Sequence, residues 1–190
     1  MKVGILAVQG DFEAHAAMLA RLGVPHGFVR TPADLAGVDA LILPGGESTT
    51  QLKFLAEEGL EKAIREFAAQ GGAFFGTCAG TILLAREVRN PPQASLGLMD
   101  ITVERNAYGR QVASEVRSGA CKLKEAPLEM VFIRAPVIAR VGAGVEVLAE
   151  SAGRPVLVRQ GRVLAATFHP ELTEDTTVHS HFLKLAGNGR

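Results

Sequence analysis

The sequence has little of several features that would define its class at once. It contains only two cysteines, Cys78 and Cys121, whereas small exported scaffolds need dense disulfides, so a reducing cytoplasm is the expected compartment. Its 20 basic residues are balanced by 20 acidic ones, which removes the electrostatic argument for nucleic acid or an anionic membrane as a partner. No apolar run approaches the length of a membrane span, and the apolar start of the chain is too short for a secretory signal.

What the sequence does contain is typical of a globular domain. It has 190 residues, of which 47% are hydrophobic and 21% charged. A chain of this length can bury roughly 70% of its unfolded surface in a single core. No repeat, low-complexity segment or linker divides it, so we expect one domain over residues 1–190.

The first half of the chain alternates strand and helix patterns. Apolar runs predict buried strands, and helical periodicity follows them. Ser48 and Thr49 are expected to cap the helix after the third strand, and residues 82–88 are expected to form the helix after the fourth. The predicted strands are residues 2–8, 26–29, 40–43 and 73–75, and the other predicted helices are residues 12–23 and 60–70.

The second half is different in character. From about residue 90 the segments are shorter, more β-like and interrupted by prolines. Residues 156–160 and 163–167 predict an antiparallel hairpin, and residues 176–185 predict a final helix. Together the two halves predict an α/β three-layer sandwich, with a mostly parallel central sheet and antiparallel strands in the C-terminal half.

Cys78 is the strongest candidate for a catalytic residue. It lies in Gly76-Thr77-Cys78-Ala79-Gly80, between a predicted strand and a predicted helix. A nucleophile elbow needs small neighbours, because its turn is tight, and the helix that follows favours a thiolate. Taken alone, a cysteine is more often a buried structural residue, which is how we interpret Cys121.

His169-Pro170-Glu171 supplies the base and a carboxylate to orient it. The residue before a proline is driven toward extended backbone, and in an extended segment residues two apart project on the same side. Glu171 is therefore expected to accept a hydrogen bond from one ring nitrogen of His169 and leave the other for the thiol. His15, His179 and His181 share no metal-ligand spacing, so we expect no metal and no cofactor.

Three turns are expected to meet at one crevice, because sites in open α/β sheets form outside the carboxyl ends of the strands. The turns are Gln9-Gly10, Gly45-Gly46-Glu47-Ser48 and the turn of Cys78. Backbone N–H groups of Gly46 and Ala79 are candidate donors to an oxyanion. Arg105 is expected beside the crevice, where a fixed guanidinium suits the α-carboxylate of a small substrate.

These motifs resemble the class I, triad-type glutamine amidotransferases, which hydrolyse the side-chain amide of glutamine. The finer motifs resemble the glutaminase subunits of pyridoxal 5′-phosphate synthases, nearly end to end. They are Leu6-Ala7-Val8-Gln9-Gly10, Pro44-Gly45-Gly46-Glu47-Ser48-Thr49, Arg105-Asn106 through Gly109-Arg110-Gln111, and Phe132-Ile133-Arg134-Ala135-Pro136. Residues 114–117 depart from the aromatic and acidic pattern associated with that point in the family.

The resemblance implies a role for each matching residue. Cys78 would be the nucleophile, His169 the base and Glu171 the orienting residue, with Gly46 and Ala79 as oxyanion donors. Gln9 would be coupled to partner docking. The residues implied to bind L-glutamine are Gly46, Glu47, Ser48, Arg105, Ile133 and Arg134.

The resemblance also implies a partner. Ammonia would pass in trans to a (β/α)8-barrel synthase subunit in a hetero-oligomer, which joins it to a pentose phosphate and a triose phosphate to give pyridoxal phosphate. Two alternatives stay open at this point. One is a triad amidotransferase that serves a different synthase. The other is a peptidase-like or chaperone-like relative, or a silent binding module, although such relatives often carry an acidic residue beside the cysteine where this chain has Thr77.

Overall fold

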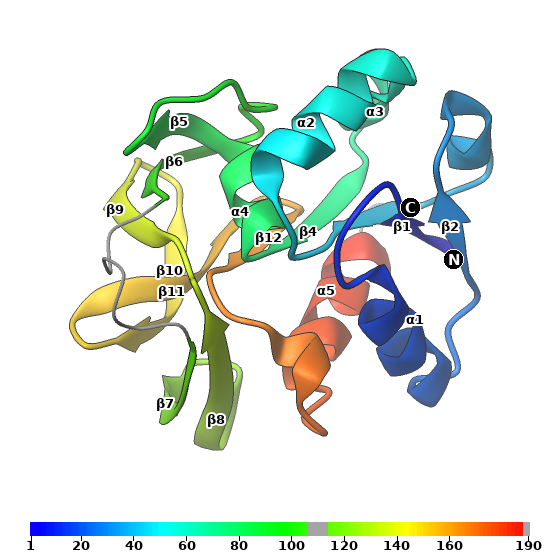
Figure 1. Cartoon of the computed structure of the whole chain (residues 1–190). Helices are drawn as coiled ribbons and strands as arrows, with labels where there is room; N and C mark the ends of the chain where they lie inside the picture. Colours follow the sequence, from blue (N-terminus) through cyan, green and yellow to red (C-terminus); the bar gives the residue numbers. More distant parts are fainter. Residues whose placement is uncertain (106–113, 188–190) are drawn as a thin grey trace.

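The computed structural model describes residues 1–105 and 114–187, and within them nine strands form one sheet (Figure 1). The order is β2-β1-β3-β4-β12-β11-β10-β7-β8. The strands are β1 (Val3–Leu6), β2 (His26–Val29), β3 (Ala40–Leu43), β4 (Ala73–Thr77), β7 (Ser114–Cys121), β8 (Lys124–Ile133), β10 (Glu146–Ser151), β11 (Arg154–Gln160) and β12 (Val163–Ala166).

One half of this sheet is parallel and the other antiparallel, as the sequence predicts. Strand β1 lies between β2 and β3, and β4 lies between β3 and β12, all in parallel register. Strands β11 and β12 form the predicted hairpin, and antiparallel pairing continues through β10 and β7 to β8. The predicted α/β class, with a parallel sheet extended by antiparallel strands, is confirmed.

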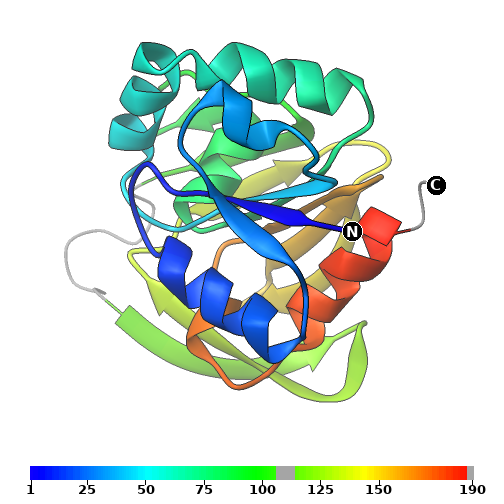
Figure 2. The same ribbon diagram turned by 90° about the vertical axis from the view of Figure 1, so that its right-hand side faces the viewer.

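Helices cover both faces of the sheet (Figure 2). On one face lie α1 (Phe12–Arg21) and α5 (Thr177–Gly187), and on the other lie α2 (Ser48–Glu57), α3 (Leu60–Ala69) and α4 (Ala79–Leu84). Successive side chains of a strand point to opposite faces, so each face has its own core. Phe75 belongs to the core under α1 and α5, and Phe74 belongs to the core under α2 and α3.

A second, smaller sheet flanks the first. It contains β5 (Ala85–Arg89), β6 (Met99–Glu104) and β9 (Val137–Val141), in the order β5-β6-β9. The prediction of a helix over residues 82–88 is wrong here, because α4 ends at Leu84 and the chain continues as β5. The cause is non-local: β5 pairs in parallel with β6, and Ala85 and Val88 bury their side chains while the residues between them stay exposed.

The cap of α2 also differs from the prediction. Glu47, and not Ser48 or Thr49, is the N-cap residue, and its carboxylate accepts hydrogen bonds from the Thr49 backbone N–H and hydroxyl. Ser48 is the first helical residue and is buried. Two short 3₁₀ turns complete the described chain, η1 (Pro32–Leu35) and η2 (Pro170–Leu172). None of the helices described is both long and apolar enough to cross a membrane.

Candidate active site

A pocket of about 320 Å³ opens at the carboxyl ends of β1, β3 and β4. The three predicted turns therefore meet in space. Of the site residues predicted from the sequence, only Glu171 is absent from the lining, because it lies behind His169. The predicted residues that line the pocket are Gln9, Gly46, Glu47, Ser48, Cys78, Ala79, Arg105, Ile133, Arg134 and His169.

Cys78 sits in a strained turn between β4 and α4. Its φ is 47° and its ψ is −104°, a backbone conformation that side chains other than glycine rarely adopt. A Cβ added to Gly80 would lie 1.9 Å from the carbonyl oxygen of Leu43, and one added to Gly76 would lie 2.6 Å from the Gly80 backbone. Gly80 thus lets the turn pack against β3, and Gly76 lets α4 pack closely against β4. The Cys78 side chain lines the pocket, with Sγ 3.7 Å from the Ile133 carbonyl oxygen.

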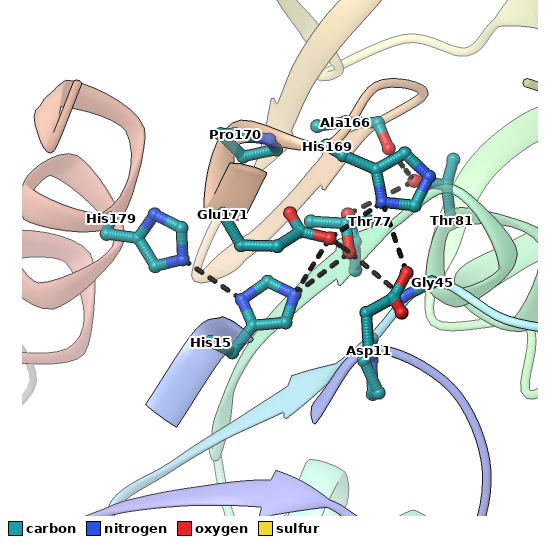
Figure 3. A network of polar contacts seen from close by, with 12 residues as sticks. Asp11, His15, Gly45, Thr77, Thr81, Ala166, His169, Pro170, Glu171 and His179 are labelled. Carbon is teal, nitrogen blue, oxygen red and sulfur yellow. Dashed lines mark hydrogen bonds and ion pairs between the residues drawn. The ribbon is translucent and has the colours of Figure 1, made fainter. Parts of the chain in front are cut away.

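His169 is hydrogen-bonded to Glu171 and packs closely against the backbone of Gly45. Its Nδ1 donates to Glu171 Oε1 over 2.7 Å (Figure 3). The predicted pair is therefore present, but Glu171 reaches the ring from the 3₁₀ turn η2 and not from extended backbone. Gly45 packs against the same ring, since a Cβ there would lie 2.4 Å from His169 Cε1.

The electrostatics of this pair favour a charged imidazole. Burial lowers the pKa of His169, but its interactions with Cys78 and Glu171 outweigh burial and raise the pKa to about 10. Burial raises the pKa of Glu171, yet the neighbouring His15 and the hydrogen bond from His169 outweigh it and hold that pKa below its ordinary value. Around neutral pH the site therefore holds an imidazolium between an ionised carboxylate and the cysteine sulfur.

Charged side chains form the outer wall of the pocket. A guanidinium nitrogen of Arg105 lies 3.1 Å from Glu47 Oε1, and the Arg105 side chain is only 15% exposed. Partial burial raises the pKa of Glu47, but hydrogen bonds from Thr49 and the charges of Arg105 and Arg134 outweigh burial. The pKa of Glu47 is therefore below its ordinary value. The wall therefore presents a carboxylate and guanidinium groups to whatever binds.

Gln9 holds the loop that carries Gly46. Its Oε1 accepts a hydrogen bond from the Glu47 backbone N–H over 2.7 Å, and its backbone oxygen accepts one from the Gln51 amide over 3.0 Å. A Cβ on Gly46 would lie 2.4 Å from that same Oε1, so the loop can lie this close only with a glycine. Ala79 is the first residue of α4, where a backbone N–H has no intrahelical acceptor.

Sequence reasoning missed several polar groups behind Glu171. His15 and His179 are fully buried and hydrogen-bonded to each other over 3.0 Å, and His15 also contacts Thr77 Oγ1 over 3.1 Å (Figure 3). Asp11, half exposed, places Oδ2 3.8 Å from His169 Nδ1. No spacing rule connects His15 to His179 across 164 positions, so a motif search could not find them.

Asp11, His169 and Glu171 place one potential metal-ligand atom each within 4.8 Å of one another. The His169 ring atom in this group is Nδ1, which already donates its proton to Glu171. A metal needs the lone pair of that nitrogen, so the contact fits a histidine–carboxylate pair better than a metal site.

Three remaining expectations can be placed on the structure. Cys121 is a free, buried cysteine on β7, and burial raises the pKa of its thiol. Ser114, the first residue of the segment that departs from the family pattern, pairs in register with the pocket residue Ile133. The motif from Asn106 through Gln111 lies outside the described residues.

An open α/β sheet with a cysteine elbow at its carboxyl edge is the architecture of the class I glutamine amidotransferases. The model of the SNO glutamine amidotransferase family matches residues 5–187, and the chain belongs to this family. It is 55% identical to the pyridoxal 5′-phosphate synthase subunit PdxT of Koribacter versatilis (strain Ellin345), covering 100% of this chain and 97% of the relative. It is 56% identical to the subunit of the same name from Deinococcus radiodurans, covering 98% of each.

Solved structures agree with this assignment. A crystal structure of a glutamine amidotransferase matches with a TM-score of 0.91 and 52% identity, over 97% of this chain and 98% of the other. The structure of PurLQS from Thermotoga maritima matches with a TM-score of 0.70 at 17% identity, which supports the fold alone.

Proposed function

We propose that the chain hydrolyses L-glutamine to L-glutamate and ammonia through Cys78, His169 and Glu171. The observation that carries the proposal is the strained Cys78 turn sharing one pocket with an imidazole that a buried carboxylate holds by Nδ1. That arrangement is the nucleophile–base–orienter geometry of covalent acyl transfer. It occurs here in a chain of a glutamine amidotransferase family.

In this mechanism, the Cys78 sulfur attacks the carbonyl carbon of the glutamine side-chain amide. Backbone N–H groups of Gly46 and Ala79 stabilise the oxyanion, each donor contributing about 10²–10³ in rate. The His169 imidazolium gives its proton to the amide nitrogen, the carbon–nitrogen bond breaks, and ammonia leaves. Neutral His169 then takes a proton from water, which attacks the γ-glutamyl thioester and releases glutamate and the Cys78 sulfur.

The charged wall supports glutamine as the substrate. A free amino acid carries one positive and one negative group at its α-carbon, and the wall supplies both complementary signs through Glu47 and Arg105. We assign the α-carboxylate to Arg105, with Arg134 beside it. Ser48 and Ile133 complete the binding surface for the rest of the side chain.

We further propose that the ammonia serves a (β/α)8-barrel synthase subunit that makes pyridoxal 5′-phosphate in the cytoplasm. The support is that the relatives at 55–56% identity are named as subunits of pyridoxal 5′-phosphate synthase. Docking would act through Gln9, because this side chain holds the Gly46 loop by hydrogen bonds to Glu47 and Gln51. A second chain that presses on Gln9 would thereby adjust the oxyanion donors.

The test is ammonia release from glutamine by the wild type, Cys78→Ala and Cys121→Ala, each with and without a barrel synthase subunit from a PdxT-containing system. We expect Cys78→Ala to lose at least about 10³-fold of the activity. Cys121→Ala, a matched cysteine removal outside the pocket, keeps it. Near-normal turnover by Cys78→Ala would refute the assignment of Cys78 as the nucleophile. Equal wild-type rates of ammonia release with and without the synthase subunit would refute the proposal that this subunit is the partner.

A further inference from the structure

A buried polar cluster lies directly behind the pocket and has no role in the mechanism above. It consists of His15 on α1, Thr77 at the end of β4 and His179 on α5, all 0% exposed (Figure 3). Buried polar groups destabilise a fold unless they are hydrogen-bonded, and here each of the three residues has a partner in the cluster. The cluster ends on Glu171.

The partners of Thr77 determine where its proton points. Its Oγ1 lies 3.1 Å from the Gly45 backbone nitrogen, which can only donate, so the hydroxyl accepts there. Oγ1 also lies 3.4 Å from Glu171 Oε1, an ionised carboxylate that can only accept. The third neighbour, His15 Nε2, can donate or accept according to its tautomer, so we assign the single hydroxyl proton of Thr77 to Glu171, which can only accept.

This direction fixes the protons of the two histidines in turn. With its own proton committed, Thr77 Oγ1 accepts from His15 Nε2, so the His15 proton is on Nε2 and Nδ1 is an acceptor. His179 Nε2 must then donate to His15 Nδ1, which leaves the lone pair on His179 Nδ1. That atom has no hydrogen-bond partner among the described residues. Burial is the largest influence on both rings and lowers the pKa of each, which favours the neutral forms that this assignment uses.

Two donors and the edge of the His15 ring consequently surround one oxygen of Glu171. His169 Nδ1 donates from the pocket side at 2.7 Å, the Thr77 hydroxyl lies at 3.4 Å, and His15 Nε2 lies at 3.5 Å. The same Thr77 hydroxyl binds the backbone of Gly45, which contacts the His169 ring and precedes Gly46. One hydroxyl thus connects the orienting carboxylate with the loop of the proposed oxyanion donor.

We propose that Thr77 and His15 are positioning residues for glutamine hydrolysis, which hold Glu171 and the Gly45 loop in register with each other. The inference rests on the proposed function and deepens it. A purely structural role is the competing explanation, because His15 and His179 also pack edge-on against Phe75. The two explanations differ in kinetics: packing affects the stability of the fold, whereas positioning affects turnover in protein that is folded.

The experiment compares Thr77→Val, which keeps the shape and removes the hydroxyl, with Thr77→Ser, which restores it. Thr102→Val is the matched control, since Thr102 is a buried threonine whose hydroxyl donates to a different carboxylate, that of Glu87 on the second sheet. We expect Thr77→Val to lower kcat for ammonia release at least tenfold with KM within about twofold, because a small misplacement of a triad costs turnover. Thr77→Ser restores most of the loss, and Thr102→Val stays within twofold of the wild type.

A pH profile gives a readout that packing does not move. The titratable groups that face Glu171 are His15 and His169, with His179 behind His15, and Asp11 and Cys78 lie near His169. With one donor fewer, the carboxylate protonates at higher pH, so the acid limb of the kcat profile shifts upward in Thr77→Val and not in Thr102→Val. If Thr77→Val fails to fold, His15→Leu against His15→Gln, which keeps an N–H near the Nε2 position, makes the same comparison.

Iodoacetamide labelling of Cys78, measured by mass spectrometry of its peptide, separates this inference from the proposed function. If the wild type with synthase releases no ammonia, the proposed function fails. The labelling rate of Cys78 still tests the inference, because we expect it to be at least threefold slower in Thr77→Val than in the wild type at neutral pH. The inference is overturned if Thr77→Val is less stable but keeps kcat, the acid limb and Cys78 labelling at wild-type values. It is overturned equally if Thr77→Ser behaves like Thr77→Val.

Discussion

Gly45→Ala is the substitution from which the structure predicts the most specific effect. Gly45 has no positive φ, so its backbone accepts an alanine without strain. The new methyl group would lie 2.4 Å from His169 Cε1 and 3.0 Å from Nδ1, whereas ordinary contacts begin at 3.4 Å. The three nearest atoms all belong to the imidazole, so the ring is the group that has to move, by about 1 Å.

The size of the effect follows from that displacement. A misplacement of about 1 Å at a reacting group costs on the order of 10²-fold in rate. Movement of the ring also stretches the 2.7 Å hydrogen bond from Nδ1 to Glu171, which supports the raised pKa of His169. Overpacking by one methyl group costs about 1–3 kcal/mol of stability, which a folded domain tolerates. We expect kcat for ammonia release to fall about 10²-fold in protein that remains folded.

The assay measures steady-state ammonia release with the synthase subunit present, together with the thermal midpoint of unfolding. Gly27→Ala is the matched control, because its methyl group would meet only the side chain of Lys2, at an ordinary 3.5 Å. A folded Gly45→Ala protein with kcat within threefold of the wild type would show that the imidazole does not depend on the bare backbone beside it. The proposed geometry of the base would then be wrong.

Three further predictions concern the pocket wall, the elbow and the buried histidines. Arg105→Met should raise KM for glutamine at least tenfold with a smaller change in kcat, because a charge-assisted hydrogen bond contributes about 1.5–3 kcal/mol; an unchanged KM would exclude Arg105 from binding. Gly80→Ala should lower the stability by about 3 kcal/mol or more, or prevent folding, since its Cβ would lie 1.9 Å from a backbone oxygen, and a melting curve checks this. The pKa of His179 in the folded state is about 3, below the ordinary 6.5. As the pH falls, the unfolded state therefore binds a proton first, and the free energy of unfolding decreases between pH 6.5 and pH 3. Denaturant titrations should show a loss of about 2 kcal/mol from this group by pH 5, absent in His179→Gln and retained in the His26→Gln control.

The sequence was sufficient for the parts of the fold that local chemistry encodes. Strands β1, β3 and β4 are short, fully buried apolar runs, and the predicted strands overlap β1 to β4. The pocket could be predicted for the same reason, because the carboxyl edge of a parallel sheet brings the turns of Gln9, Gly46 and Cys78 together. Glycines that a turn requires are visible in a sequence, and so are the reactive residues they frame.

The larger error occurs where a distant segment decides the local structure. Residues 85–88 are predicted as the end of a helix because their composition permits one. They become β5 because β6, more than ten residues further on, offers a parallel partner, and propensity is a weak prior against such pairing. The cap of α2 is a smaller error of a different, local kind, since the carboxylate of Glu47 accepts from the Thr49 backbone and replaces the hydroxyl caps expected at Ser48 and Thr49.

The buried histidines show why a site can be predicted without its supports. His15 and His179 lie on the inner faces of α1 and α5. The helical periodicity of the sequence is the same whether a buried polar residue only packs in the core or also positions a catalytic group. They are hydrogen-bonded to each other, and His15 is linked to the site by the hydroxyl of Thr77, at the strand end that turns into the elbow. The residue beside the nucleophile is thus the meeting point of α1, the Gly45 loop and Glu171, and it is there that substitution should separate positioning from packing.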